Sequence, residues 1–207
     1  ILRGADADFS AGNDMQDFMK FIQTPLQGKA GDTPPFVLLK ATARFSKPLI
    51  AAVRGVAIGI GVTLLLHADL VYSDNTALFQ IPFVSLGLSP EGASSKLLVQ
   101  QAGFPKAAEL LLTAQKFNSD KALNAGLINS IEEDVYATAQ QQAHILAALP
   151  LASLKQTKAL MKHNLDEIID CIDHEAEIFM KRVGSPEMME AVQAFMQKRK
   201  PDFTQFH

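Results

Sequence analysis

The sequence predicts an α/β domain whose last third is a layer of helices. Short apolar runs typical of buried strands occupy the middle of the chain, and glycines mark the turn from one of them into a helix. From residue 97 onward, the apolar residues recur mainly at helical spacing. A length of 207 residues with 48% hydrophobic content is enough for a substantial core. We therefore divide the chain into a core, residues 1–134, and a C-terminal helical region, residues 135–207.

The central strand is predicted at residues 48–53, where an apolar run follows a proline. Glycines at positions 55, 59 and 61 mark the turn into a helix that includes the apolar run at residues 62–67. The backbone N–H groups near Ile60 and Gly61 would lie in the first turn of this helix and lack acceptors within it. Such a helix start favours a developing negative charge.

Two further strands are expected at residues 70–72 and 77–79, and Ser89-Pro90-Glu91 is typical of a helix start. Residue types alone leave two interpretations of Glu91. It can be an acid that complements a helix dipole, or a catalytic acid in apolar surroundings. His67, in the preceding predicted helix, is the one histidine expected near this position.

The opening residues 1–4 are typical of the end of a strand, and we expect earlier parts of the fold to precede them. A small-residue turn at residues 9–14 precedes an amphipathic helix whose apolar residues run from Met15 to Ile22. Its start offers a second set of free N–H groups. The remaining expected elements are a loop at 25–35, a strand at 127–131, and helices at 36–45, 97–102, 106–113, 119–125, 135–148, 152–164, 165–183 and 186–199.

Composition excludes several classes of function. A net charge of −3 without a basic run argues against nucleic-acid binding, and the longest apolar run, residues 55–66, is too short to cross a bilayer. Cys171 is the only cysteine, so no internal disulfide is possible, and we expect a cytoplasmic protein. The five histidines are not spaced as metal ligands, and no dinucleotide fingerprint, phosphate loop or nucleophile elbow occurs.

Four segments, together with the last helix, resemble the crotonase (enoyl-CoA hydratase/isomerase) superfamily over essentially the whole chain. The segments are residues 9–14, 47–59, 68–72 and 125–128. The resemblance implies a crotonase-like spiral core of ββα turns and a C-terminal helical region that builds trimers or hexamers. It also implies an acyl-CoA thioester as substrate. No separate cofactor is expected, because coenzyme A is part of the substrate.

The resemblance also implies roles for individual residues. Hydratases of this superfamily carry two glutamates at positions that correspond here to Thr63 and Phe83, so simple hydration is not expected. Glu91 corresponds to the base of the Δ3,Δ2-enoyl-CoA isomerases, and an apolar pocket including Phe83, Leu86 and Leu88 is expected to raise its pKa. The resemblance assigns the oxyanion hole to the backbone N–H groups of Asn13 and Ile60, and substrate contacts to Ala11, Gly12, Ala57, Gly59, Phe83 and Leu86.

Two alternatives to a 3-enoyl-CoA isomerase stay open at this point. One is another crotonase-type enzyme, such as a hydratase, dienoyl-CoA isomerase, thioesterase or decarboxylase, with the same oxyanion hole and acids elsewhere. The other is a catalytically silent module that binds acyl-CoA or partner proteins. Glu91 is the discriminating feature, because a silent module has no need of an acid there.

Overall fold

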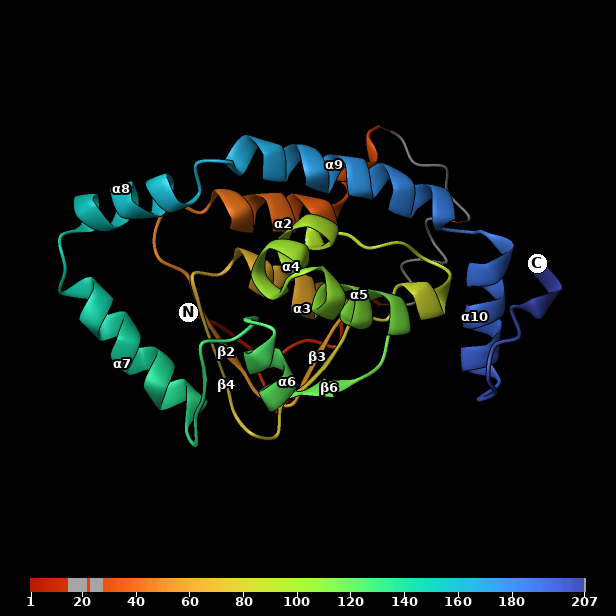
Figure 1. Cartoon of the computed structure of the whole chain (residues 1–207), viewed down its shortest axis with the longest axis horizontal. Helices are drawn as coiled ribbons and strands as arrows, with labels where there is room; N and C mark the ends of the chain where they lie inside the picture. The colour runs from red at the N-terminus through yellow and green to blue at the C-terminus, as the bar shows by residue number, and fades with distance from the viewer. Residues whose placement is uncertain (15–21, 23–27, 207) are drawn as a thin grey trace.

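The computed structural model describes residues 1–14, 22 and 28–206. In these residues, helices surround two small sheets, and a pair of helices extends from one side of the molecule (Figure 1). The helix expected from Met15 to Ile22 falls almost entirely outside the described residues. None of the helices in the described part is long and apolar enough to span a membrane.

The first sheet is fully parallel and contains the predicted central strand. All four residues of that strand, β2, are buried, as is usual for a parallel strand covered on both faces. Strands expected at residues 1–4, 48–53 and 70–72 are confirmed, and only the end of the run at 127–131 is a strand. The strand order is β1 (Leu2–Arg3), β2 (Ile50–Val53), β4 (Leu70–Ser73) and β7 (Ser130–Ile131).

The second sheet includes two strands that sequence reasoning missed. It consists of β3 (Val56–Ile58), β5 (Leu78–Gln80) and β6 (Phe117–Asn118), with β3 parallel and β6 antiparallel to β5. The segment of β3 was expected to be part of a turn, because Gly55 and Gly59 flank it in the sequence. In the structure both glycines have positive φ, but the residues between them form a strand. Three residues between such glycines are too few to show a strand pattern.

The helices of the core lie where helical periodicity placed them, with shifted ends. The helix α2 (Pro34–Arg44) begins two residues before the expected start, because Pro34 and Pro35 fit its first turn. It packs along α9 (Leu165–Arg182), where the rings of Phe36 and Phe179 meet edge to face at 5.9 Å (Figure 1). The central helix α3 (Ile60–Thr63) continues as a 3-10 turn through Leu64–His67.

The helix start expected at Ser89-Pro90-Glu91 is wrong. These residues are not helical, and α4 (Ser94–Ala102) begins after Gly92 and Ala93, which both have positive φ. Ser89 and Pro90 therefore belong to the connection that leads to Glu91. The helix α4 starts at Ser94 without a side-chain cap from the residue before it.

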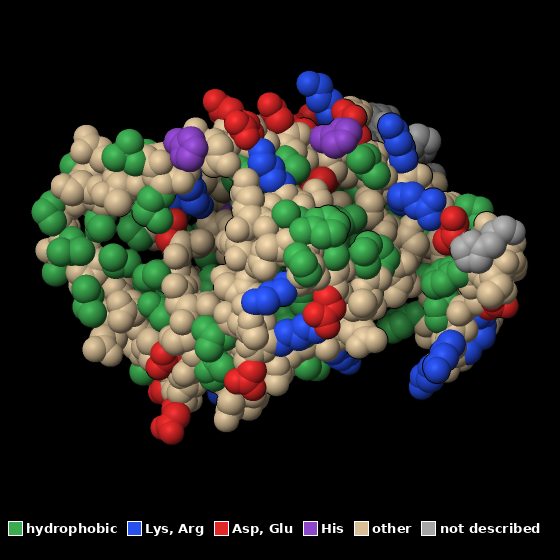
Figure 2. All heavy atoms as spheres, in the orientation of Figure 1, with side chains coloured by type: hydrophobic (Ala, Val, Ile, Leu, Met, Phe, Trp, Pro, Cys, Tyr) green, Lys and Arg blue, Asp and Glu red, His purple; other side chains and the backbone are tan. Residues whose placement is uncertain are grey.

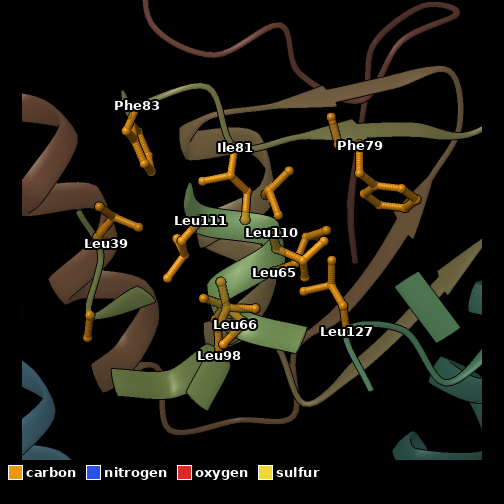
Figure 3. Close-up of a cluster of buried hydrophobic side chains, with 14 of the residues drawn as sticks. Leu39, Leu65, Leu66, Phe79, Ile81, Phe83, Leu98, Leu110, Leu111 and Leu127 are labelled. Atoms are coloured by element: carbon orange, nitrogen blue, oxygen red, sulfur yellow. The ribbon is translucent and has the colours of Figure 1, made fainter. Parts of the chain in front are cut away.

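One large apolar core joins the sheets to the inner helices (Figure 3). Side chains from α2, from α4, from α5 (Phe104–Thr113) and from the segment after α6 (Ser119–Asn124) point into it together with those of the central strands. The labelled members include Leu39, Leu65, Phe79, Ile81, Leu98, Leu110, Leu111 and Leu127. This packing fixes the position of α3 relative to α2 and α4.

The C-terminal helices are α7 (Val135–Ala147), α8 (Leu151–Met161), α9 and α10 (Pro186–Met196). The first of them packs on the first sheet through Val135 and Ala139, and α8 extends away from the core (Figure 1). The side chain of Lys158 anchors α8, because its ammonium group binds Asp69 at 2.6 Å and the carbonyl of Lys47 at 2.8 Å.

Candidate functional site

Two glycines allow the loop before residue 14 to lie against the start of α3. Ser10 pairs with Ala57 of β3, and the Ile58 N–H donates to the Ser10 carbonyl at 2.9 Å. A Cβ on Gly61 would lie 2.8 Å from that carbonyl oxygen, and a Cβ on Gly12 would lie 2.8 Å from the carbonyl oxygen of Ile58. The close approach therefore requires glycine at both positions.

Two cavities adjoin this junction, and Asn13 and Ile60 line both of them. The first has a volume of about 610 Å³ and the second about 400 Å³. Ile60 is the first residue of α3, so its N–H group has no acceptor within the helix. The structure thus brings together the two residues expected to form the oxyanion hole, at the boundary between the cavities.

The walls of the cavities come from different elements. Apolar residues of α2 and α9 line the first, among them Pro34, Pro35, Phe36, Leu38, Phe179 and Met180. Five of the six residues expected to contact substrate line the second cavity, namely Ala11, Gly12, Gly59, Phe83 and Leu86. Ala57 does not line either cavity, because it is fully buried in β3 beneath the junction.

Glu91 lines the first cavity and is 2% exposed. Its Oε1 accepts a hydrogen bond from the Thr63 hydroxyl at 2.5 Å, while Oε2 has no hydrogen-bond partner among the described residues. Thr63 lies one turn after Ile60 in α3 and is itself fully buried. One oxygen of the carboxyl group is therefore held, and the other is available.

His67 fixes the backbone next to Glu91. It is 2% exposed, and its Nε2 lies 2.9 Å from the Gly92 carbonyl oxygen. Burial lowers the pKa of His67 to about 4, so at neutral pH the ring is neutral and Nε2 carries the proton that it donates to Gly92. His67 was the histidine expected near the site, and the structure shows it as a positioning group.

Burial raises the pKa of Glu91 to about 8, with the hydrogen bond from Thr63 acting against this rise and the nearby charge of Glu175 adding to it. The expected direction is confirmed. Of its expected surroundings, Phe83, Leu86 and Leu88 line the second cavity, whereas Glu91 lines the first. The connection after β5 carries these three residues past the junction, whereas Glu91 follows later and packs beneath α3.

A family model described as "Enoyl-CoA hydratase/isomerase" matches residues 1–206. The chain belongs to the enoyl-CoA hydratase/isomerase family. Its two small sheets and surrounding helices are the crotonase fold of that family, and we assign it as an acyl-CoA enzyme.

Relatives in the enoyl-CoA hydratase/isomerase family include proteins named for different reactions. A crystal structure described as an enoyl-CoA hydratase/isomerase from Acinetobacter baumannii is 73% identical, with a TM-score of 0.88, and the match covers 91% of this chain and 78% of that one. Enoyl-CoA delta isomerase 2 of Rattus norvegicus is 33% identical over 97% of this chain and 52% of its own length. The 2,3-dehydroadipyl-CoA hydratase of Escherichia coli is 28% identical over 98% of this chain and 79% of its own length.

Two polar residues of this family member escaped sequence reasoning. Thr63 was considered only as the position of a missing hydratase acid, yet its hydroxyl binds Glu91. Glu175 lies in α9, far along the chain, and no local pattern links it to the site. Among the described residues, no group of three or more histidines, cysteines or acids is placed to hold a metal ion.

Proposed function

We propose that this enzyme moves the double bond of a 3-enoyl-CoA from C3 to C2, with Glu91 as the base. One observation carries the proposal. A fully buried carboxyl group lines the larger cavity, with one oxygen fixed by Thr63 and the other without a partner among the described residues. That second oxygen is suited to take a proton from C2 of the substrate and return it at C4.

The raised pKa of Glu91 supports this role. A carboxylate with an ordinary pKa is a weak base for a proton next to a thioester, and efficient proton transfer needs a base whose pKa lies near the working pH. At about 8, the pKa of Glu91 meets that condition. Because only the ionised carboxylate accepts a proton, the proposal predicts that activity rises with pH and levels off above about 8.

The enolate formed by proton removal places negative charge on the thioester oxygen. Asn13 and Ile60 line both cavities, and in this proposal their backbone N–H groups stabilise that oxygen. A single donor of this kind typically contributes about 3 kcal/mol to the transition state. The proton taken from C2 is returned at C4, so the reaction needs no external acid and no redox partner.

A second candidate is a reaction that uses two acids, such as isomerisation of a dienoyl-CoA. Asp14 favours it, because this exposed carboxyl group lines the same cavity as Glu91. The positions that correspond to the two hydratase glutamates hold Thr63 and Phe83, so hydration has less support. Asp14→Asn separates the two candidates, because a reaction with one base would keep most of its rate and a reaction with two acids would lose it.

The proposal is tested by a coupled assay on the purified full-length protein. A 3-enoyl-CoA is supplied, and the 2-enoyl-CoA formed is consumed by added hydratase and dehydrogenase while NADH is recorded. Wild type should turn over, Glu91→Gln should lose about a hundredfold or more in kcat, and the exposed Glu177→Gln should match wild type. Full activity in Glu91→Gln, or hydration of 2-enoyl-CoA faster than isomerisation, would overturn the assignment.

A further inference from the structure

A second buried glutamate caps the helix that follows Glu91. Glu175 of α9 is 5% exposed, and its Oε1 accepts hydrogen bonds from the Ser95 N–H at 3.0 Å and from the Ser95 hydroxyl at 2.5 Å. The residue before α4 is Ala93, which has positive φ and offers no side-chain cap. Glu175 therefore supplies, from another helix, the acceptor that the N-terminus of α4 lacks.

The same turn carries Glu91. The Ser94 N–H donates to the Glu91 carbonyl at 3.2 Å, and Ser95 follows directly as the residue held by Glu175. The Oε2 atoms of Glu91 and Glu175 are both buried and have no hydrogen-bond partner among the described residues. Two carboxyl groups thus belong to one small buried cluster, on either side of the turn that leads into α4.

Hydrogen bonding indicates which of the two carboxyl groups holds the charge. Burial raises the pKa of Glu175 above its usual value, but two hydrogen bonds from Ser95 and the position at the positive end of α4 act against this rise and favour a carboxylate. Glu91 receives one hydrogen bond, from Thr63. In the free enzyme at neutral pH, the shared environment therefore places a proton on Glu91 and the negative charge on Glu175.

The other ionisable groups around the cluster do not offset this charge. His67 is neutral near pH 7, and burial raises the pKa of the Cys171 thiol to about 11, so both are uncharged. Asp14 lines the first cavity from the loop at residues 9–14, and an acidic side chain cannot offset a negative charge. Two lysines of the flanking helices are paired elsewhere, Lys96 with Glu167 at 2.7 Å and Lys40 with Asp173 at 2.7 Å.

We propose that Glu175 is a positioning residue for the reaction proposed above, because it fixes the start of α4 and holds a negative charge beside Glu91. The inference rests on the proposed function. The charge on Glu175 makes it harder for Glu91 to ionise, so that Glu91 is a stronger base when it meets the C2 proton. Loss of that charge should therefore weaken the base without removing it.

The test compares Glu175→Gln, which keeps the shape and an oxygen acceptor for Ser95, with the exposed Glu177→Gln on the same helix. Two readouts are recorded on the full-length protein. One is the pH profile of kcat/KM, and the other is the titration of the Glu91 carboxyl carbon by NMR in protein labelled with carbon-13 glutamate, assigned with Glu91→Gln. The NMR titration does not depend on turnover, so it still tests the inference if wild type shows no isomerase activity.

We expect Glu175→Gln to lower the apparent pKa of Glu91 by about one pH unit in both readouts and to lower the rate at alkaline pH. Glu177→Gln should leave both unchanged. Ser95→Ala gives an independent check. It removes the hydroxyl hydrogen bond that stabilises the negative charge on Glu175, so it should also lower the pKa of Glu91, by a smaller amount than Glu175→Gln does. A uniform loss of rate in Glu175→Gln with an unchanged titration of Glu91 would overturn the inference and leave only a structural role.

Discussion

Replacing Glu91 by glutamine is predicted to remove a pH-dependent loss of stability. Burial raises the pKa of this carboxyl group from 4.5 to about 8, so between these values the folded protein binds a proton that the unfolded chain has released. Stability from this source is fully present below about pH 4.5 and is lost progressively as pH rises through about 8. Glutamine cannot ionise, so the variant should lack this loss.

The size of the effect follows from the difference between the folded and unfolded pKa values. At about 1.36 kcal/mol per pH unit, the raised pKa of Glu91 lowers the free energy of unfolding, relative to its value below pH 4.5, by roughly 3 kcal/mol at neutral pH and by roughly 5 kcal/mol well above pH 8. These values are of the same order as the whole stability of many domains. A buried amide has its own cost, but that cost is the same at every pH.

Urea unfolding of wild type and Glu91→Gln at about pH 5 and about pH 8 measures the effect. Every other titrating group is common to both proteins, so its contribution largely cancels when the two pH differences are subtracted. Wild type should lose roughly 3 kcal/mol more than the variant over this interval. Parallel losses in the two proteins would show that Glu91 is already ionised in the fold, and would refute the reasoning.

Three further predictions concern the base, the anchoring of α8 and assembly. Thr63→Val removes the hydroxyl that favours the charged form of Glu91, so the pH–rate profile should move to higher pH. The rate at neutral pH should fall about tenfold for each pH unit that the profile moves. Thr63→Ser keeps a hydroxyl and should restore the wild-type profile. Lys158→Met leaves Asp69 without its closest charged partner and should lower the free energy of unfolding in urea by about 3 kcal/mol, whereas the exposed Lys155→Met should not. Exposed apolar side chains gather on α7 and α8 (Figure 2), so light scattering of the full-length protein should give a trimer or hexamer, and a fully active monomer would contradict this.

Sequence patterns were sufficient to locate helices and strands that are bounded by a proline. The strand β2 follows Pro48, and the same proline marks the end of α2, so apolar runs and this breaker located both, with the start of α2 placed two residues late. The strand β3 was missed because it is three residues long and its pairing partners are distant in sequence. The expected cap at Ser89 was wrong because the acceptor for the start of α4 comes from Glu175, on a helix packed against it from elsewhere in the chain.

The candidate site was predictable only in part. Spacing indicated a helix start near Ile60, but Glu91 was left with two interpretations until the resemblance to a family was considered. The contact of Thr63 with Glu91 spans 28 positions, and that of Glu175 with Ser95 spans 80, so neither could be inferred from local pattern. The pKa of Glu91 depends on these tertiary contacts and on complete burial. The residue could therefore be named from sequence, while its protonation state required the fold.

Proton removal from C2 is the central claim, and solvent exchange tests it most directly. The full-length enzyme is incubated in deuterium oxide with a 3-enoyl-CoA, and deuterium at C2 and C4 is followed by NMR and mass spectrometry for wild type and Glu91→Gln. Wild type should lose the C2 proton and form 2-enoyl-CoA, with exchange that falls steeply in Glu91→Gln and stays normal in Glu177→Gln. Equal exchange in wild type and Glu91→Gln, or product formation without loss of a C2 proton, would contradict the account.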